Sequence, residues 1–266
     1  MIGAIIGDVI GSRWEGSQRH PKTKKFLLFH KNCKFTDDTV LTCAVADVLM
    51  NGKDYSETIR EYYKSYPDRG FGSGFKKWAA LGVNEGYSSY GNGSAMRVSP
   101  VAYFCKTLEE VKEEAKKSAE VTHNHEQGIK GAQAIAVATF LALNGKSKQE
   151  INEAVQSFGY DTSIVLTSDH LGMDCSCEAT VPQAVYAFLY SDDFESTIRE
   201  AIMMGGDSDT IAAMAGSISH AYYKDIPEVF MKECFTRMPD ELIGIVSEFS
   251  ERYLTVDNND DCGFDI

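Results

Sequence analysis

The chain has 266 residues, 43% of them apolar, and carries a net charge of −13 from 26 Lys and Arg against 39 Asp and Glu. A diffuse negative surface repels nucleic acid and anionic membranes, and the longest apolar stretch, residues 134–143, is too short to span a bilayer, so we expect neither as a partner. The start lacks the basic segment of a signal peptide, and the seven cysteines lack the spacing of a zinc site or a disulfide framework, which together predict a cytoplasmic protein with reduced thiols.

The first expected element is a glycine-dotted helix over residues 2–9. Gly3, Gly7 and Gly11 recur at every fourth position and leave one helical face bare, so another helix could cross it closely. No strand pattern precedes these glycines, which argues against a dinucleotide-binding loop. Residues 17–34 then form a basic loop, which is either a solvated surface segment or a mobile rim beside an anionic ligand.

An acidic cluster follows at residues 35–39 and contains Thr36, Asp37 and Asp38. Apolar residues recur after it with helical spacing, so we place the cluster at a helix N-terminus. Thr and Asp are good N-caps, and acids in the first turn complement the helix dipole. Capping is therefore the ordinary explanation of this cluster taken alone.

Two glycine-rich segments, residues 67–74 and 86–97, require a backbone that bends sharply or approaches a ligand closely. The second should lead into a helix that runs to about residue 105, and its exposed N–H groups would suit a phosphate. Arg97 could add a charge-assisted contact, although the sequence at 91–93 is by itself most often a turn.

Apolar spacing and capping boxes predict further helices. These are expected over residues 55–66, 107–121, 128–143, 180–189, 194–204, 230–235 and 242–254, with another capping box at 147–150. The helix over 128–143 has little polar relief and should be buried nearly all round. We interpret residues 164–166 as a brief strand or buried coil, and the acidic residues 257–266 as a loose tail.

A second acidic cluster, residues 205–210, contains Asp207, Asp209 and Thr210 and also precedes a helical apolar pattern. If the helices after both clusters lie side by side, four carboxylates converge and repel one another strongly at low dielectric. A hard divalent cation such as Mg²⁺, Mn²⁺ or Ca²⁺ would relieve the repulsion, because all-oxygen ligand sets select such ions over zinc.

The two clusters lie far apart in the sequence, so their meeting requires one compact domain. No hairpin signal, internal repeat or linker-like change of composition interrupts residues 1–266. We therefore predict a single-domain, all-α orthogonal bundle of ten or more helices, with the glycine-rich loops gathered at one end.

Six motifs carry a resemblance to a known family, and they lie at residues 7–15, 36–39, 67–72, 91–97, 122–125 and 205–210. In this order they resemble the ADP-ribosylglycohydrolases, which include the dinitrogenase reductase-activating glycohydrolase and the ADP-ribosyl-acceptor hydrolases. The likeness runs from about residue 2 to about residue 225. Each motif is weak by itself, but six in order are specific. The resemblance implies an all-helical fold of the ADP-ribosylglycohydrolase type with a binuclear Mg²⁺ or Mn²⁺ centre.

The resemblance also implies roles for individual residues. The metal ligands would be Thr36, Asp37, Asp38, Asp207, Asp209 and Thr210. The catalytic residues would be Glu15, Asp37, Asp38 and Asp209, since Glu15 matches a glutamate that lies at the metals in some members. The contacts to ADP-ribose would be Asp68, Gly70, Gly72, Gly91, Asn92, Gly93, Ser94, Met96 and His123. The departures from the family pattern are the basic loop, residues 160–177 and His220.

The function so implied is metal-dependent hydrolysis of the glycosidic bond at C1″ of ADP-ribose attached to a protein side chain or a small acceptor. Three alternatives stay open: a catalytically silent ADP-ribose-binding or crystallin-like member of the fold, a calcium-dependent nucleoside hydrolase, and a metal phosphohydrolase. The complete set of acids disfavours the first, and the lack of an N-terminal strand pattern disfavours the second. The motifs do not specify the acceptor, because arginine, serine, O-acetyl and nucleobase conjugates share the same ADP-ribose half.

Overall fold

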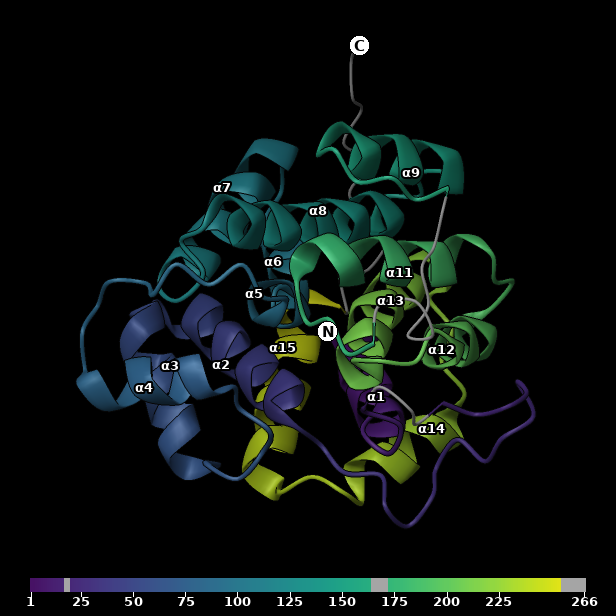
Figure 1. The fold of residues 1–266 in the computed structure, drawn as a ribbon, viewed down its shortest axis with the longest axis horizontal. Helices are drawn as coiled ribbons and strands as arrows, with labels where there is room; N and C mark the ends of the chain where they lie inside the picture. Colours follow the sequence, from purple (N-terminus) through teal and green to yellow (C-terminus); the bar gives the residue numbers. More distant parts are fainter. Residues whose placement is uncertain (17–19, 164–171, 255–266) are drawn as a thin grey trace.

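Two helices from opposite ends of the sequence, α1 (Ile2–Gly11) and α13 (Ser208–Tyr223), cross at the centre of the computed structural model (Figure 1). The glycine face of α1 lets them meet. A β-carbon on Gly3 would lie 2.2 Å from the Gly216 carbonyl oxygen, and one on Gly7 would lie 2.1 Å from the Ala212 carbonyl oxygen. The close crossing expected for this face is therefore confirmed. Because the helices run antiparallel, the end of α1 meets the start of α13.

The structure describes residues 1–16, 20–163 and 172–254, and within these ranges it contains fourteen helices and no strand. Two isolated β-bridges join Gly16 to Gly206 and Gly91 to Ser176. The all-α prediction is thus confirmed, whereas the expectations for residues 164–166 and 257–266 fall outside the described ranges. The remaining helices are α2 (Asp37–Asn51), α3 (Tyr55–Ser65), α4 (Ser73–Leu81), α5 (Gly93–Met96), α6 (Ser99–Phe104), α7 (Leu108–Glu120), α8 (Glu126–Leu143), α9 (Lys148–Ser157), α11 (Cys177–Leu189), α12 (Phe194–Met203), α14 (Glu228–Phe235) and α15 (Asp240–Tyr253).

The other helices pack in two groups beside the central pair (Figure 1). On one side α2 contacts α3, α6 and α15, and on the other α8 contacts α7, α9 and α11. As expected, no residue over 128–143 of α8 is exposed. None of the helices in the described ranges combines the length and the apolarity needed to cross a membrane.

The helices differ from the sequence-based expectation in three places. The helix α4 was not predicted, because its glycine-rich start resembles a loop and only Phe75, Trp78 and Ala79 are buried along it. The single helix expected up to residue 105 is divided into α5 and α6. Pro100 explains the division, since it has no N–H to donate to the carbonyl of Met96. The helix expected from residue 180 begins earlier, at Cys177, which is the first residue of α11.

Candidate active site and metal centre

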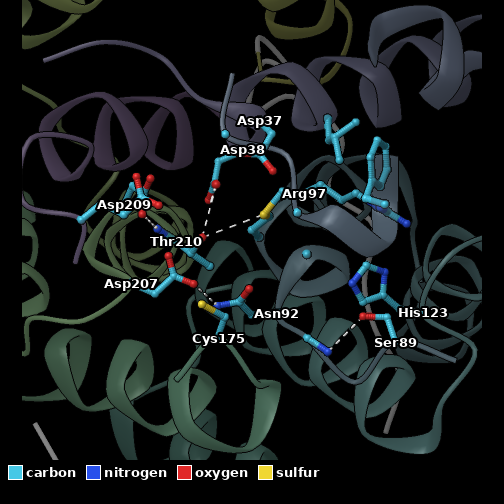
Figure 2. A pocket seen from close by; sticks show the side chains of 18 of the residues that line it. Asp37, Asp38, Ser89, Asn92, Arg97, His123, Cys175, Asp207, Asp209 and Thr210 are labelled. Carbon is cyan, nitrogen blue, oxygen red and sulfur yellow. Dashed lines mark hydrogen bonds between the residues drawn. The ribbon is translucent and has the colours of Figure 1, made fainter. Parts of the chain in front are cut away.

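One cavity opens where the end of α1 meets the starts of α2, α5 and α13 (Figure 2). Its volume is about 320 Å³, within the range of small-molecule sites. The acids that line it are Glu15, Asp37, Asp38, Asp207 and Asp209. The two acidic clusters meet here, since the Thr210 hydroxyl donates a hydrogen bond to Asp38 Oδ2 at 3.3 Å. The convergence on which the metal-site hypothesis depends is therefore present.

Local sequence turns both clusters into helix starts. Thr36 is the N-cap of α2, and its Oγ1 accepts a hydrogen bond from the Asp38 N–H at 3.3 Å. The glycines at 205–206 both have positive φ and turn the chain toward Asp207, the N-cap of α13. The Asp207 side chain makes no capping bond and instead accepts one from Asn92 Nδ2 at 2.7 Å. Its carboxylate is therefore directed to the cavity rather than to its own helix.

Asp8 on α1 is the residue of this centre that the sequence analysis left without a role. Its side chain is fully buried, and its Oδ1 accepts a hydrogen bond from Thr36 Oγ1 at 2.7 Å. Its Oδ2 accepts bonds from the N–H groups of Thr36 and Thr39 and from Thr39 Oγ1. A signal was available, since Asp8 is the one acid in the apolar run over residues 2–10 and a buried carboxylate needs partners.

Two groups of carboxylates at this centre have the spacing to hold cations. One oxygen each from Asp8, Asp38 and Asp209 lie within 4.8 Å of one another, and so do one each from Glu15, Asp207 and Asp209. Asp38 Oδ1 is buried and has no hydrogen-bond partner among the described residues. Such an oxygen requires a proton or a cation. The all-oxygen donor set fits Mg²⁺ or Mn²⁺, with Asp209 common to both groups.

The crowding of these acids opposes their ionisation when no cation is bound. Burial, together with the charges of Asp8 and Asp207, raises the pKa of Asp37 to about 8. Burial and the neighbouring carboxylates raise the pKa values of Asp38 and Asp209 well above the usual range. Burial also raises the pKa of Asp8, against the effect of its hydrogen bonds. A divalent cation would reverse these shifts, because it binds the ionised form.

The glycine-rich loop before α5 forms the facing wall. Of the ADP-ribose contacts predicted here, those that line the cavity are Gly91 and Asn92 of the loop and Gly93 and Met96 of α5. A β-carbon on Gly93 would lie 3.0 Å from the ring of His123, so the glycine is what allows the imidazole to approach the backbone. Ser94 turns the other way and donates to the Gly128 carbonyl oxygen at 2.7 Å, outside the described lining.

His123 is held as a neutral hydrogen-bond donor at this wall. Burial and the charge of Arg97 lower the pKa of His123 well below its usual range. Its Nδ1 lies 2.7 Å from Thr122 Oγ1, which accepts a bond from Arg97 Nη2 at 2.9 Å. The described contacts offer the Thr122 hydroxyl proton no acceptor besides Nδ1, so the imidazole proton is assigned to Nε2. That N–H, beside Gly93, is placed to donate to a ligand oxygen.

The segment before α4 supports Asp37. The Arg69 carbonyl accepts a bond from the Asp37 N–H at 2.7 Å, and a β-carbon on Gly70 would lie 2.8 Å from Asp37 Oδ1. Gly70 and Gly72 line the cavity. Asp68, in contrast, is exposed and lies outside the described lining. The hydroxyl of Thr36 also lies outside the described lining, and it donates a hydrogen bond to Asp8.

Several cavity residues carried no signal in the sequence. They come from the helices α2 and α4 and from loops, and are Leu41, Phe75, Tyr87, Ser89, Met173 and Cys175. The Cys175 thiol donates a hydrogen bond to Asp207, and burial raises the pKa of that thiol. In Figure 2 the acids and Thr210 occupy one side of the cavity, while Ser89 and His123 occupy the other. The cavity therefore joins an acidic half to a half with hydrogen-bond donors and aromatic rings.

Comparison with known proteins identifies relatives along nearly the whole chain. The family model for ADP-ribosylglycohydrolase matches residues 1–258. ADP-ribosylhydrolase ARH3 of Homo sapiens is 28% identical, with 88% of this chain and 87% of the relative covered. ADP-ribosylarginine hydrolase Tri1 of Pseudomonas putida (strain GB-1) is 27% identical, with 84% of this chain and 69% of the relative covered.

A solved structure shares the fold. It is described as an ADP-ribosylglycohydrolase-related protein complex, and it superposes with a TM-score of 0.73 at 21% identity. The match covers 94% of this chain and 96% of that one, so the helical arrangement is common to both along nearly their whole lengths. The family match over residues 1–258 shows that the chain belongs to the ADP-ribosylglycohydrolase family.

Proposed function

We propose that the protein hydrolyses the glycosidic bond at C1″ of ADP-ribose attached to a protein side chain or a small acceptor, and that it does so with two Mg²⁺ or Mn²⁺ ions bound. The observation that carries the proposal is the meeting of two distant acidic clusters in one cavity beside a glycine-rich loop. The hydrolase names of the relatives agree with this activity.

The carboxylates form two groups, each of which would bind one ion. Asp8, Asp38 and Asp209 would hold one ion, and Glu15, Asp207 and Asp209 the other. Bound ions would supply Lewis acidity and a nucleophilic water at neutral pH. Asp37 lines the same cavity and adds negative charge beside the sugar. Since the transition state of glycoside cleavage has oxocarbenium character, this negative charge stabilises it.

Glu15 is the candidate general base. It lines the cavity, lies four residues after the end of α1, and belongs to the second carboxylate group. A carboxylate in that place can take the proton of the attacking water. On the opposite wall the Nε2–H of His123, which lies against Gly93, would donate to a ligand oxygen.

The test is replacement of a shared carboxylate. Asp209→Asn keeps the shape of the side chain but removes a ligand from both groups, and we expect release of ADP-ribose to fall by about 10³-fold or more, equal to about 4 kcal/mol of barrier. Asp47→Asn is the matched control, because Asp47 is a buried acid of α2 that bonds Lys53 and Asn51 outside the cavity. The assay is ADP-ribose release from arginine, serine, O-acetyl and nucleobase conjugates, with each metal and with excess chelator. Undiminished turnover in chelator, or equal activity of both variants, would contradict the proposal.

The same assay decides between the alternatives. Release of phosphate instead of ADP-ribose would indicate a phosphohydrolase. Thermal stabilisation by Mn²⁺ without turnover of any conjugate would indicate a silent, ADP-ribose-binding or crystallin-like member. The helical fold of the described ranges already disfavours a nucleoside hydrolase of the α/β class. Relatives with two different hydrolase names match at nearly equal identity, so the panel is also the measurement that identifies the acceptor.

A further inference from the structure

A second cavity lies where the ends of α6, α8, α13 and α15 come together. Its volume is about 480 Å³, larger than that of the acidic cavity and within the range of small-molecule sites. The helix α13 carries Asp209 in its first turn and reaches this cavity at its last, and its sixteen residues make it about 24 Å long. None of the residues that line it belongs to the proposed active site.

Two polar groups on the wall of this cavity have no hydrogen-bond partner among the described residues. Tyr103 is 5% exposed and its hydroxyl makes no hydrogen bond, while His220 is half-buried and its buried Nδ1 atom also lacks a partner. Native structures leave few buried donors or acceptors unpaired. Burial and the nearby amino terminus lower the pKa of His220 to about 3, so its ring is neutral. The wall therefore offers neutral hydrogen-bonding groups to whatever fills the cavity.

The remaining lining is apolar at the sides and positive at the mouth. Phe140, Leu143 and Tyr253 supply apolar surface. Lys106 and Lys224 are both exposed, and the described lining contains no Asp or Glu. Four helix C-termini bring fractional negative charge, which the two full charges of Lys106 and Lys224 offset. The described lining holds no carboxylate, so its full charges are the two ammonium groups, and these can pair with an anion rather than with an organic cation.

We propose that this cavity is a second ligand site, separate from the active site, for a small organic anion with an apolar body. Its carboxylate or sulfonate head would accept hydrogen bonds from Lys106, Lys224 and the Tyr103 hydroxyl. Its body would cover Phe140, Leu143 and Tyr253 and displace water from them. A bare inorganic anion would leave that apolar surface exposed, and a neutral hydrocarbon would leave the hydroxyl unpaired.

The test uses the full chain loaded with Mg²⁺ and two probes, 8-anilinonaphthalene-1-sulfonate followed by fluorescence and octanoate as its competitor. We expect saturable binding of one probe molecule, displaced by octanoate and not by ADP-ribose. Lys106→Gln combined with Lys224→Gln should weaken probe binding at least tenfold. Lys64→Gln is the matched control, because Lys64 is an exposed lysine in the last turn of α3, outside the cavity, and should leave binding unchanged.

Tyr103→Phe separates a ligand-binding role from a purely structural one. The substitution keeps the ring and removes the unpartnered hydroxyl, so the melting temperature without ligand should stay level or rise while probe affinity falls about tenfold. The proposal is overturned if wild-type protein does not bind the probe, if ADP-ribose displaces it, or if the lysine variants bind like the wild type. It is also overturned if binding requires deletion of residues 255–266, because the acidic end of the chain would then be the occupant.

Discussion

Replacing Gly11 with alanine tests whether the crossing of α1 and α13 sets the position of Asp209. A β-carbon at Gly11 would lie 2.6 Å from Asp209 Cα and 2.6 Å from the Ser208 carbonyl oxygen. Ordinary contacts of a β-carbon begin at 3.4 Å, so the start of α13 would have to move by about 0.8 Å. The atoms it meets belong to the backbone, and no rotation of a side chain can relieve the contact.

The expected effect on stability is small, and the effect on the site is large. Alanine favours a helix over glycine by about 1 kcal/mol, while overpacking a tight contact costs about 1–3 kcal/mol. The net loss for Gly11→Ala is therefore at most about 2 kcal/mol, or a melting temperature lower by roughly 4–8 °C. A catalytic group displaced by close to 1 Å can cost about 10²-fold in rate. We expect ADP-ribose release to fall about a hundredfold, with weaker binding of Mn²⁺.

Gly244→Ala provides the matched control, because Gly244 lies within α15 and a β-carbon there would have no atom within 4 Å. It should raise the free energy of unfolding by about 1 kcal/mol and leave activity unchanged. Circular dichroism during heating gives the stability, calorimetric titration gives the Mn²⁺ affinity, and ADP-ribose release gives the rate. If Gly11→Ala matched Gly244→Ala in all three, the crossing would not determine the geometry of the site.

Two further predictions concern titration and charge. Because burial lowers the pKa of His220 to about 3 from 6.5, the unfolded chain binds a proton that the folded chain does not between these values. Stability should therefore fall on acidification through this window by about 1.4 kcal/mol per pH unit, and urea unfolding of His220→Gln should show a shallower fall. Lys22→Gln with Lys25→Gln should raise KM and flatten its salt dependence if the basic loop attracts an anionic substrate. Lys24 instead pairs with Glu200 of α12, so Lys24→Gln is the comparison, and an unchanged salt profile in the double variant would exclude this role.

The sequence predicted the acidic helix starts well because their signals are local. A threonine that caps its own helix and two glycines that end the preceding one act over a few residues, and both appear at residues 36 and 205–206 as expected. The glycine face of α1 could also be predicted, because glycines four residues apart leave one side of a helix without side chains. The helix α4 was not predicted because only three of its residues are buried, too few to show a helical spacing of apolar residues.

The predicted binding residues depended on more than local signals. Ser94 lies between the cavity-lining Gly93 and Met96, yet its hydroxyl bonds the Gly128 carbonyl of α8. Asp68 is two residues from Gly70 but lies outside the described lining of the cavity, while Gly70 lies against Asp37. Which way such a side chain turns is decided by the packing of a distant helix, and no spacing in the motif records it. The same holds for Cys175, whose partner Asp207 is 32 positions further along the chain.

Asp8 and the glycines of α1 belong to one arrangement. Gly7 and Gly11 place α13 in backbone contact on one face, while Asp8, turned by about 100° from Gly7, accepts four hydrogen bonds from the start of α2. The helix α1 therefore fixes the two acid-bearing helices relative to each other through contacts that need no cation. The backbone contacts with α13 do not depend on the charge of any carboxylate. Burial and the repulsion between carboxylates together raise the pKa values of Asp38 and Asp209, and α1 holds these carboxylates close to one another. A bound cation would therefore relieve the repulsion without having to assemble the site.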